Sequence, residues 1–426
     1  MKKAWMLITL VIICVIASPD YFVLNNFGET ISSGTWLSAL NNDIITVESI
    51  PNQILSVDGA IWVVSSGASR IQRFTPDETG LTLSREFALP AGSNPYLMYI
   101  FGNMVYTTLW VSGGIGIINT ESGSVLATDP FCLGPQGIFA DSSNIFVTAG
   151  NLDPIDFTYG PGQLWRLSPE GAPIDFLEIG TNPQQIIRGA DGNLHIVCTG
   201  DYFSIDGVVY IVDPVSFTVI DSVNLGGWPQ RLALDEYSGV VYSATSNWDL
   251  IGSGRLLAYD SRTHSLLWSA ESAGNSLSGT GIVGLAAFEN HVFLPSMDSS
   301  FVEICNIDRV TMILTRVARY TTGYGPIDVA LVDETGIEEN RTANPMDLLS
   351  ISPSPFNGEC FIRSTFKLEE VILFDLSGRE IDRISIETIL ANDTKWAPDP
   401  TVPSGVYLVK AVGDAGSKIG RVVYIK

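Results

Sequence analysis

Three segments of the chain combine acidic and aromatic side chains in a way that can bind a ligand. They are Asn151–Gly162, Gly200–Gly207 and Ser246–Gly254. Aspartate carboxylates supply the oxygen ligands that a hard cation such as Ca²⁺ prefers, and aromatic rings stack on a sugar ring or a peptide side chain. The candidate ligand-binding residues are Asp153, Asp156, Tyr159, Asp201, Tyr202, Asp206, Trp248 and Asp249. Because Asp, Gly and Pro also form turns, the alternative is that these residues only shape the loops and cover sheet edges.

Motifs for catalysis are absent from the sequence. The three histidines, His195, His264 and His291, lie far apart along the chain. There is no H-E-x-x-H, Walker A, G-x-S-x-G or C-x-x-C-H motif, and no segment has the spacing of an EF-hand. The sequence therefore predicts no catalytic residue and no metal site, and it favours a binding protein over an enzyme.

An internal repeat organises most of the chain. Each copy has a Pro-containing or Gly-containing turn, an apolar strand, a polar turn and a second apolar strand. Copies begin at Pro51, Pro95, Pro135, Pro183, Pro229, Gly281 and Pro326, at intervals of 40 to 52 residues. Between them lies a second hairpin, such as GIGIINTESGSVLATD, so that each unit supplies four strands. A repeat of this length is typical of β-propeller blades, which stack around a channel because one sheet cannot bury both its faces alone.

The two ends of the repeat region complete each other. The copy at Pro326 supplies an inner strand and then stops, whereas the segment from Tyr21 supplies three strands without an inner one. Together they make one blade. We therefore predict a seven-bladed propeller over residues 18–335, closed by Pro326–Asp333 lying beside the segment near Tyr21–Asn25.

The repeats resemble those of YncE-like propellers of the YVTN or NHL type. The stretches that carry the resemblance are PQRLALDEYSGVVYSATS, INTESGSVLATD and VVYIVDPVSFTVIDSV. The resemblance covers about residues 20–335 and implies a seven-bladed architecture, but no activity, because such propellers have many functions. In a propeller whose strands are named A to D from the hub outward, the B–C and D–A connections share one face with the channel mouth. The three acidic segments are B–C loops of this kind.

Three glutamines occupy equivalent positions in the repeat. Gln136, Gln184 and Gln230 each follow a blade proline directly, which places them near the channel mouth. Their repetition favours a hydrogen-bonding role in the D–A turn over ligand recognition.

The C-terminal region is a separate all-β segment. Residues 336–347 are polar and form a linker, and residues 348–426 contain short strands with frequent turns, as an Ig-like sandwich does. The run Ser354–Asn357, the segment Val371–Arg379, Trp396 and the run Ser404–Tyr407 resemble type IX secretion sorting domains and FlgD-like Ig modules. The resemblance implies that this domain directs the propeller to secretion machinery. The alternative is an ordinary accessory sandwich.

The N-terminal segment and the charge indicate export. Lys2 and Lys3 precede an apolar run that ends at Ala17, which predicts a signal peptide over residues 1–17, with an uncleaved anchor as the alternative. Residues 18–343 hold 12 Arg, no Lys and 35 acidic residues. Such an acidic domain repels phosphate backbones, so nucleic acid is excluded as a partner. No transmembrane segment is predicted in the mature chain.

These observations predict an all-β protein that is secreted or displayed on the cell surface and binds a glycan, a peptide or a surface protein. No cofactor is predicted, and Ca²⁺ stays open as a candidate. The alternative is a secreted propeller enzyme, of the lactonase, lyase or quinone-dependent dehydrogenase type, with its site at the channel mouth. A third hypothesis is a structural envelope component without a small ligand.

Overall fold

The computed structural model describes two stretches of the chain. They are residues 21–332, except 36–38, 78–79, 154, 247–253 and 310, and residues 349–426, except 353–357, 365–366, 376–378, 387–392, 400, 414–415 and 425. Contacts divide the chain into two compact units, Met1–Glu338 and Glu339–Lys426. Nearly all secondary structure in the described residues is β, and the single helical turn found there is the 3-10 helix η1 (Met297–Ser299). Among these residues, no helix has the length and hydropathy needed to cross a bilayer.

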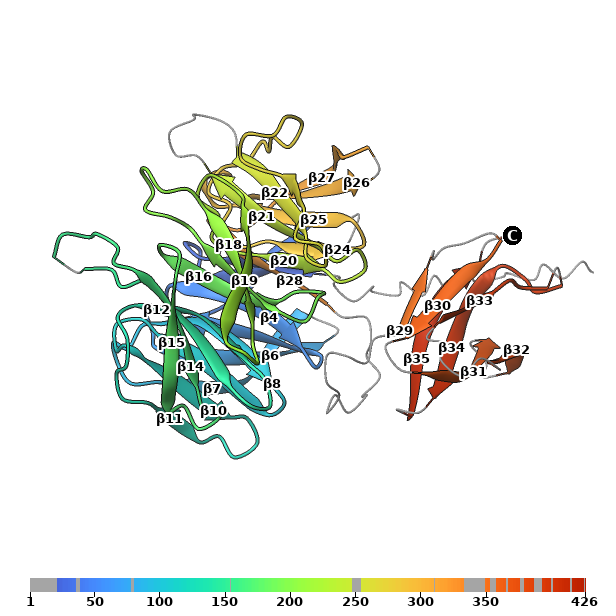
Figure 1. The fold of residues 1–426 in the computed structure, drawn as a ribbon, viewed down its shortest axis with the longest axis horizontal. Helices are drawn as coiled ribbons and strands as arrows, with labels where there is room; N and C mark the ends of the chain where they lie inside the picture. Colours follow the sequence, from blue (N-terminus) through green and yellow to red (C-terminus); the bar gives the residue numbers. More distant parts are fainter. Residues whose placement is uncertain are drawn as a thin grey trace, which may run out of the picture. The chain divides into compact units, whose positions relative to one another are not determined.

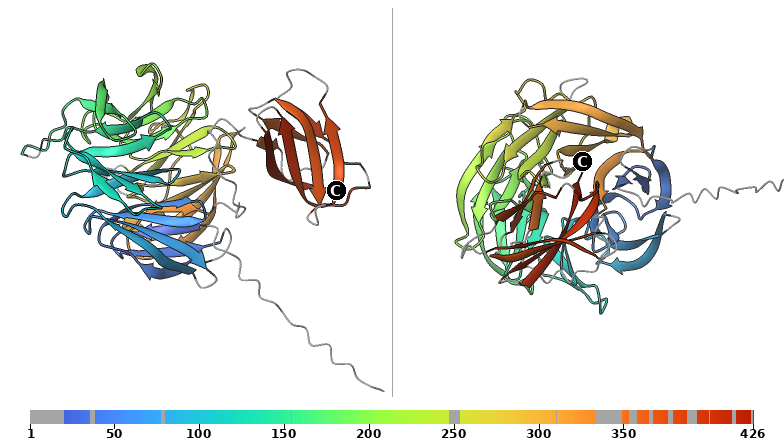
Figure 2. Two further views of the ribbon diagram at one scale, coloured as in Figure 1. Left: turned by 90° about the horizontal axis from the view of Figure 1, so that it is seen from below. Right: turned by 90° about the vertical axis from the view of Figure 1, so that its right-hand side faces the viewer.

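The first unit is a ring of seven antiparallel four-stranded sheets among the described residues (Figures 1 and 2). From the inner strand outward, blades one to four are β28 (Pro326–Leu331), β1 (Tyr21–Asn25), β2 (Thr30–Gly34), β3 (Asn41–Thr46); β4 (Pro51–Val57), β5 (Ala60–Ser65), β6 (Arg70–Asp77), β7 (Gly80–Ala88); β8 (Pro95–Phe101), β9 (Met104–Leu109), β10 (Gly114–Asn119), β11 (Val125–Ala127); and β12 (Pro135–Ala140), β13 (Ile145–Ala149), β14 (Gly162–Leu167), β15 (Pro173–Ile179). Blades five to seven are β16 (Pro183–Arg188), β17 (Leu194–Cys198), β18 (Val208–Asp213), β19 (Thr218–Asn224); β20 (Ala233–Asp235), β21 (Val240–Ser246), β22 (Gly254–Asp260), β23 (Leu266–Trp268); and β24 (Ala286–Phe288), β25 (His291–Ser296), β26 (Phe301–Asp308), β27 (Ile313–Thr321). The seven-bladed fold predicted from the repeat is confirmed.

The ring closes by pairing its two ends. Strand β28 runs antiparallel to β1, with Val23 opposite Val329 and Phe22 opposite Ala330. In Figure 2 the orange end of the unit meets the blue beginning. The first blade therefore takes its inner strand from one end of the unit and its three outer strands from the other. This is the closure that the incomplete repeats predict.

The alternating side chains of β1 show why closure is favourable. Phe22 and Leu24 point to one face and join a core cluster with residues of the second blade, such as Ile54. Tyr21 and Val23 point to the other face and join a cluster with the seventh blade. All four of these β1 side chains are fully buried. Because successive strand residues face opposite sides, one apolar strand fills two interfaces between blades.

The second unit is a sandwich of two antiparallel sheets. One sheet contains β29 (Leu349–Ser352), β30 (Cys360–Ser364) and β33 (Asp393–Trp396); the other contains β32 (Glu380–Ser385), β31 (Leu368–Asp375), β34 (Gly405–Gly413) and β35 (Gly416–Tyr424). Trp396 packs in the core against the rings of Tyr407 and Tyr424. The hydroxyl of Tyr407 donates to the carbonyl of Pro403 at 2.6 Å, a contact similar to the tyrosine corner of Ig-like sandwiches. The run Ser354–Asn357 lies outside the described residues.

Candidate functional site

A cavity of about 390 Å³ opens on the propeller face that carries the B–C and D–A connections. Its volume is in the range of small-molecule sites. The lining includes five side-chain amides and four aromatic residues, which are Asn52, Asn94, Gln136, Gln184 and Gln230, and Tyr96, Trp110, Tyr159 and Tyr202. The other lining residues are Ile50, Ser66, Gly67, Gly134, Gly150 and Leu152, so none of the described residues that line the cavity carries a charge.

The three glutamines predicted at the channel mouth all line this cavity. Gln136 and Gln184 are buried, and the Nε2 atoms of both donate to the Oδ1 atom of Asn182, at 2.9 and 2.8 Å. These bonds hold both amides beside Asn182, which lies between β15 and β16. Gln230 is half-buried and contributes its amide to the lining of the same cavity.

A series of hydroxyl groups fixes the inner strands that carry these amides. Thr108 Oγ1 donates to the carbonyl of Gln136 at 2.8 Å, and Thr148 Oγ1 donates to that of Gln184 at 3.0 Å. Ser66 Oγ, two positions later in the repeat, donates to the carbonyl of Pro95 at 2.8 Å. Each bond joins a residue beside the last residue of a B strand, either just before or just after it, to the first or second residue of the next blade's inner strand. Sequence analysis missed this pattern, although a Ser or Thr near the end of the B strand in several copies is its signal.

Tyr159 and Tyr202 are the loop aromatics that the structure brings together. They come from successive B–C loops, and their ring centroids lie 6.4 Å apart. Burial raises the pKa of both hydroxyls, and Tyr96 raises it further. All three tyrosines therefore lie close together at the cavity. At neutral pH the hydroxyls of Tyr159 and Tyr202 stay protonated, so both can donate a hydrogen bond to a ligand.

The loop aspartates serve mainly as turn residues. The Oδ1 atom of Asp153 accepts from the backbone N–H of Ile155 at 2.7 Å, and Oδ1 of Asp156 accepts from that of Thr158 at 2.9 Å. The Oδ1 atom of Asp201 accepts three backbone N–H groups of its own loop, at 2.8 to 2.9 Å. Local bonds of this kind from an aspartate side chain to the next backbone N–H groups are typical of turns.

The loop aspartates considered as candidate Ca²⁺ ligands do not gather in the part of the chain that the structure describes. Three or more acidic, His or Cys side chains close enough to share one ion are found there only in a different group, which lies on other loops. Asp206 is exposed at the end of its loop. Trp248 and Asp249 lie outside the described residues.

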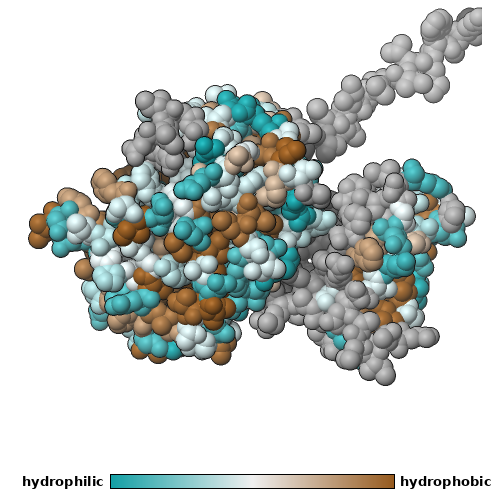
Figure 3. All heavy atoms as spheres, turned by 45° about the horizontal axis from the view of Figure 1, so that its top comes forward, coloured by the Kyte–Doolittle hydropathy of each residue, from teal (hydrophilic) through white to brown (hydrophobic). Residues whose placement is uncertain are grey.

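Hydrophobic side chains stand exposed on the same loops. Phe157 is 72% exposed and Phe203 is 92% exposed, and Ile155 and Ile205 accompany them. In Figure 3 brown atoms mark the end of the loop that projects on the left. None of these four side chains lines the cavity. A more open hollow of about 450 Å³ lies against Phe131, Cys132 and Trp165.

The four cysteines of the described residues are free. Burial raises the pKa of Cys132 and Cys305 to about 12 and that of Cys360 to about 11. Burial also raises the pKa of Cys198. Because the thiolate is the reactive form, none of these thiols is a nucleophile near neutral pH.

A carboxyl group is buried at the hub of the ring. Asp328 on β28 accepts the backbone N–H of Ile54 from the next inner strand, at 3.2 Å. Burial raises its pKa to about 6, although Arg231 opposes the rise. The folded state therefore holds this proton more tightly than the unfolded chain, whose Asp pKa is about 3.9.

This buried carboxyl group predicts a pH-dependent stability. The contribution of protonated Asp328 is complete below about pH 4 and is lost as the pH rises through about 6. Between pH 4 and pH 7, we expect wild type to lose about 3 kcal/mol of unfolding free energy relative to Asp328→Asn. Urea unfolding followed by tryptophan fluorescence at each pH measures the difference. Asp58→Asn, in an exposed turn, is the matched control, and parallel curves for wild type and Asp328→Asn would contradict the prediction.

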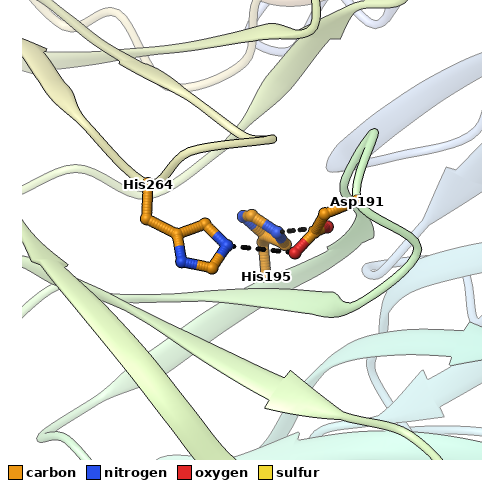
Figure 4. A group of neighbouring side chains, drawn as sticks. All are labelled: Asp191, His195 and His264. Atoms are coloured by element: carbon orange, nitrogen blue, oxygen red, sulfur yellow. Dashed lines mark hydrogen bonds and ion pairs between the residues drawn. The ribbon is translucent and has the colours of Figure 1, made fainter.

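A second polar cluster lies among the A–B and C–D turns, on the face of the propeller opposite the cavity. Figure 4 shows its three side chains. Asp191 follows β16, His195 is on β17, and His264 lies in the turn between β22 and β23 of the next blade. The Nε2 atoms of both imidazoles lie 3.0 Å from the Asp191 carboxylate, one at each oxygen. Sequence analysis missed this convergence, because the two histidines are 69 residues apart.

The pKa values of Asp191 and His264 in this cluster are shifted from their ordinary values. Burial alone would raise the pKa of Asp191, but hydrogen bonds from His195, Asn193 and His264 together lower it. Burial alone would lower the pKa of His264, but its bonds to Asp191 and Asp221 raise it overall. Carboxylate and imidazole groups thus stabilise each other across the boundary between two blades.

Comparison with known proteins bears on the fold. The sequence matches no protein-family model and no curated protein. The structure is similar to the periplasmic gluconolactonase PpgL of Pseudomonas aeruginosa, at 12% identity and a TM-score of 0.58, covering 74% of this chain and 99% of that one. The first unit of the chain is a β-propeller. A Lactobacillus plantarum protein matches at 13% identity and a TM-score of 0.57, covering 74% of this chain and 100% of that one. Hydrazine synthase of Kuenenia stuttgartiensis matches at 14% identity and a TM-score of 0.53, covering 80% of this chain and 96% of that one. At these identities the likeness of the propeller shows its fold alone.

Proposed function

We propose that this protein is a non-catalytic binding protein whose propeller cavity holds a neutral saccharide. The observation that carries the proposal is the composition of the cavity wall. Side-chain amides donate and accept hydrogen bonds, as sugar hydroxyls do, and aromatic faces pack against the apolar face of a sugar ring. An ionic ligand would need a counter-charge, and the described lining residues offer none.

An enzyme of the lactonase type is the second candidate, because one structural neighbour is a gluconolactonase. Lactone hydrolysis needs a general base or a metal-bound water at the reacting carbonyl. The described lining has neither a carboxylate nor a histidine, and its tyrosines are held protonated by burial. This composition favours binding over hydrolysis.

Titration of the full chain with neutral monosaccharides and disaccharides, followed by calorimetry, tests the proposal. Trp110 is partly exposed at the cavity, so its change to Ala should leave the fold intact while weakening binding by about tenfold or more. Gln230→Met keeps the side-chain length but removes the amide, and should also weaken binding. Phe203→Ala is the matched control outside the lining. If no saccharide binds, or if Trp110→Ala binds as tightly as wild type, the proposal is wrong.

We also propose that the sandwich of residues 349–426 is a sorting signal for export and that the propeller is displayed at or released from the cell surface. The signal-like N-terminus, the acidic charge and the resemblance to type IX sorting domains support this proposal. A fluorescent reporter with residues 1–17 at its N-terminus and residues 348–426 at its C-terminus should reach the surface or the medium of a host that has type IX machinery, whereas the same reporter without residues 348–426 should not. Retention of the fusion inside the cell would favour an accessory sandwich.

A further inference from the structure

The cluster of Asp191, His195 and His264 has the donor set of a transition-metal site. Two imidazole nitrogens and a carboxylate converge, with ligand atoms that all lie within 4.8 Å of one another. Nitrogen and carboxylate ligands of this kind suit Zn²⁺. His195 is fully buried, and the side chains of Asp191 and His264 are only 11% and 15% exposed. The ligand geometry is therefore held by the fold and does not depend on mobile surface side chains.

Each imidazole has a hydrogen-bonding partner on its Nδ1 atom, and Figure 4 shows both rings approaching Asp191. The Nδ1 atom of His264 lies 2.7 Å from a carboxylate oxygen of Asp221, and that of His195 lies 2.8 Å from the hydroxyl of Tyr259. Both Nε2 atoms consequently face Asp191. Histidine ligands of metals have such a partner on their second nitrogen, and it fixes the ring and its tautomer.

The carboxylate is fixed as well. The side chain of Asn193 donates to Oδ2 of Asp191 at 2.6 Å, and its backbone N–H approaches Oδ1 at 3.1 Å. Asp191 and Asp221 together bring two negative charges, and no Lys or Arg forms an ion pair with either of them among the described residues. A divalent cation would neutralise these charges where they are partly shielded from water.

We propose that Asp191, His195 and His264 bind a divalent transition-metal ion of the Zn²⁺ type. The ion takes the Nε2 atoms of both histidines and the carboxylate of Asp191, and a water completes its coordination. Asp221 and Tyr259 act as positioning residues through the two Nδ1 atoms. The site joins the A–B turn of the fifth blade to the C–D turn of the sixth, so the ion clips two blades together. It lies on the face opposite the saccharide cavity and is independent of that proposal.

The experiment uses the untagged full chain, stripped of metal and titrated with Zn²⁺ against a chromophoric chelator, with Co²⁺ as the spectroscopic probe. We expect one equivalent of Zn²⁺ and a Co²⁺ absorption spectrum of tetrahedral type. His264→Ala, in a turn, should lose the equivalent, whereas His291→Ala, in the seventh blade, should keep it. Asp221→Asn should weaken Zn²⁺ binding by about 10- to 100-fold without changing the stoichiometry.

Circular dichroism establishes that each variant is folded. Should His195→Ala fail to fold because its ring is buried, His264→Ala and Asp221→Asn still decide the question. If no Zn²⁺ binds at micromolar concentration, the proposal is overturned, and the three side chains connect the two blades through hydrogen bonds alone. Equal Zn²⁺ affinity in wild type and His264→Ala would also overturn it, because the ion would then bind elsewhere.

Discussion

Replacing Phe22 by alanine is expected to lower the unfolding free energy of the propeller by about 3–5 kcal/mol, the usual cost of removing a buried phenylalanine ring. Phe22 is fully buried between the first and second blades, and its strand β1 pairs with β28 from the other end of the unit. Because β1 belongs to the blade that closes the ring, all seven blades should lose stability together. Chemical unfolding followed by far-ultraviolet circular dichroism measures the loss.

The matched control is Phe203→Ala. Phe203 is 92% exposed on a B–C loop, so its removal should change stability by less than about 0.5 kcal/mol. If Phe22→Ala instead produced a separate early transition for one blade, with the rest of the unit unchanged, the closed ring would not behave as one cooperative unit. A loss as small as that of the control would contradict the burial of β1.

The propeller could be predicted because its first and last repeats are incomplete, and each lacks the strands that the other supplies. The strand from Pro326 lacks outer partners in the sequence, and the strand from Tyr21 lacks an inner one. An apolar strand with alternating buried faces, as β1 has, needs a neighbour on each side. Only one arrangement gives both strands their partners, and the pairing of β1 with β28 is that arrangement.

The cavity was predictable in part. Repeat position placed Gln136, Gln184 and Gln230 at one mouth, because equivalent residues of successive blades lie at equivalent heights around the channel. The function of Asp153 and Asp201 was not predictable, since an aspartate that closes a turn and one that binds a cation have the same sequence signal.

The histidine cluster could not be predicted, because it depends on the angle between two blades. His195 lies on β17, the second strand from the hub of the fifth blade, and His264 lies in the turn between β22 and β23 of the sixth. Their distance depends on how the twisted sheets pack, which alternation along each strand does not encode. The first sign of the cluster is spatial: an Asp191 carboxylate with one imidazole at each oxygen.

Replacing Trp396 by alanine is expected to unfold the C-terminal sandwich and leave the propeller intact. Trp396 is only 1% exposed, its ring lies 5.4 Å from that of Tyr407, and its Nε1 donates to Asp382 at 3.0 Å. Loss of a buried tryptophan costs about 3–5 kcal/mol, a large share of the 5–15 kcal/mol that stabilises a domain. Calorimetry of the full chain should show the sandwich transition lowered or lost and the propeller transition unchanged.

Phe361→Ala is the control on the same sheet, because that ring is 38% exposed. The Trp396 variant also separates the two proposed roles of the protein. If the sandwich is a sorting signal for export, Trp396→Ala should abolish export of the full chain. The purified variant should still bind its saccharide with unchanged affinity. A parallel loss of propeller stability would instead mean that the two units fold as one, and the sandwich would then be part of the binding protein's own framework.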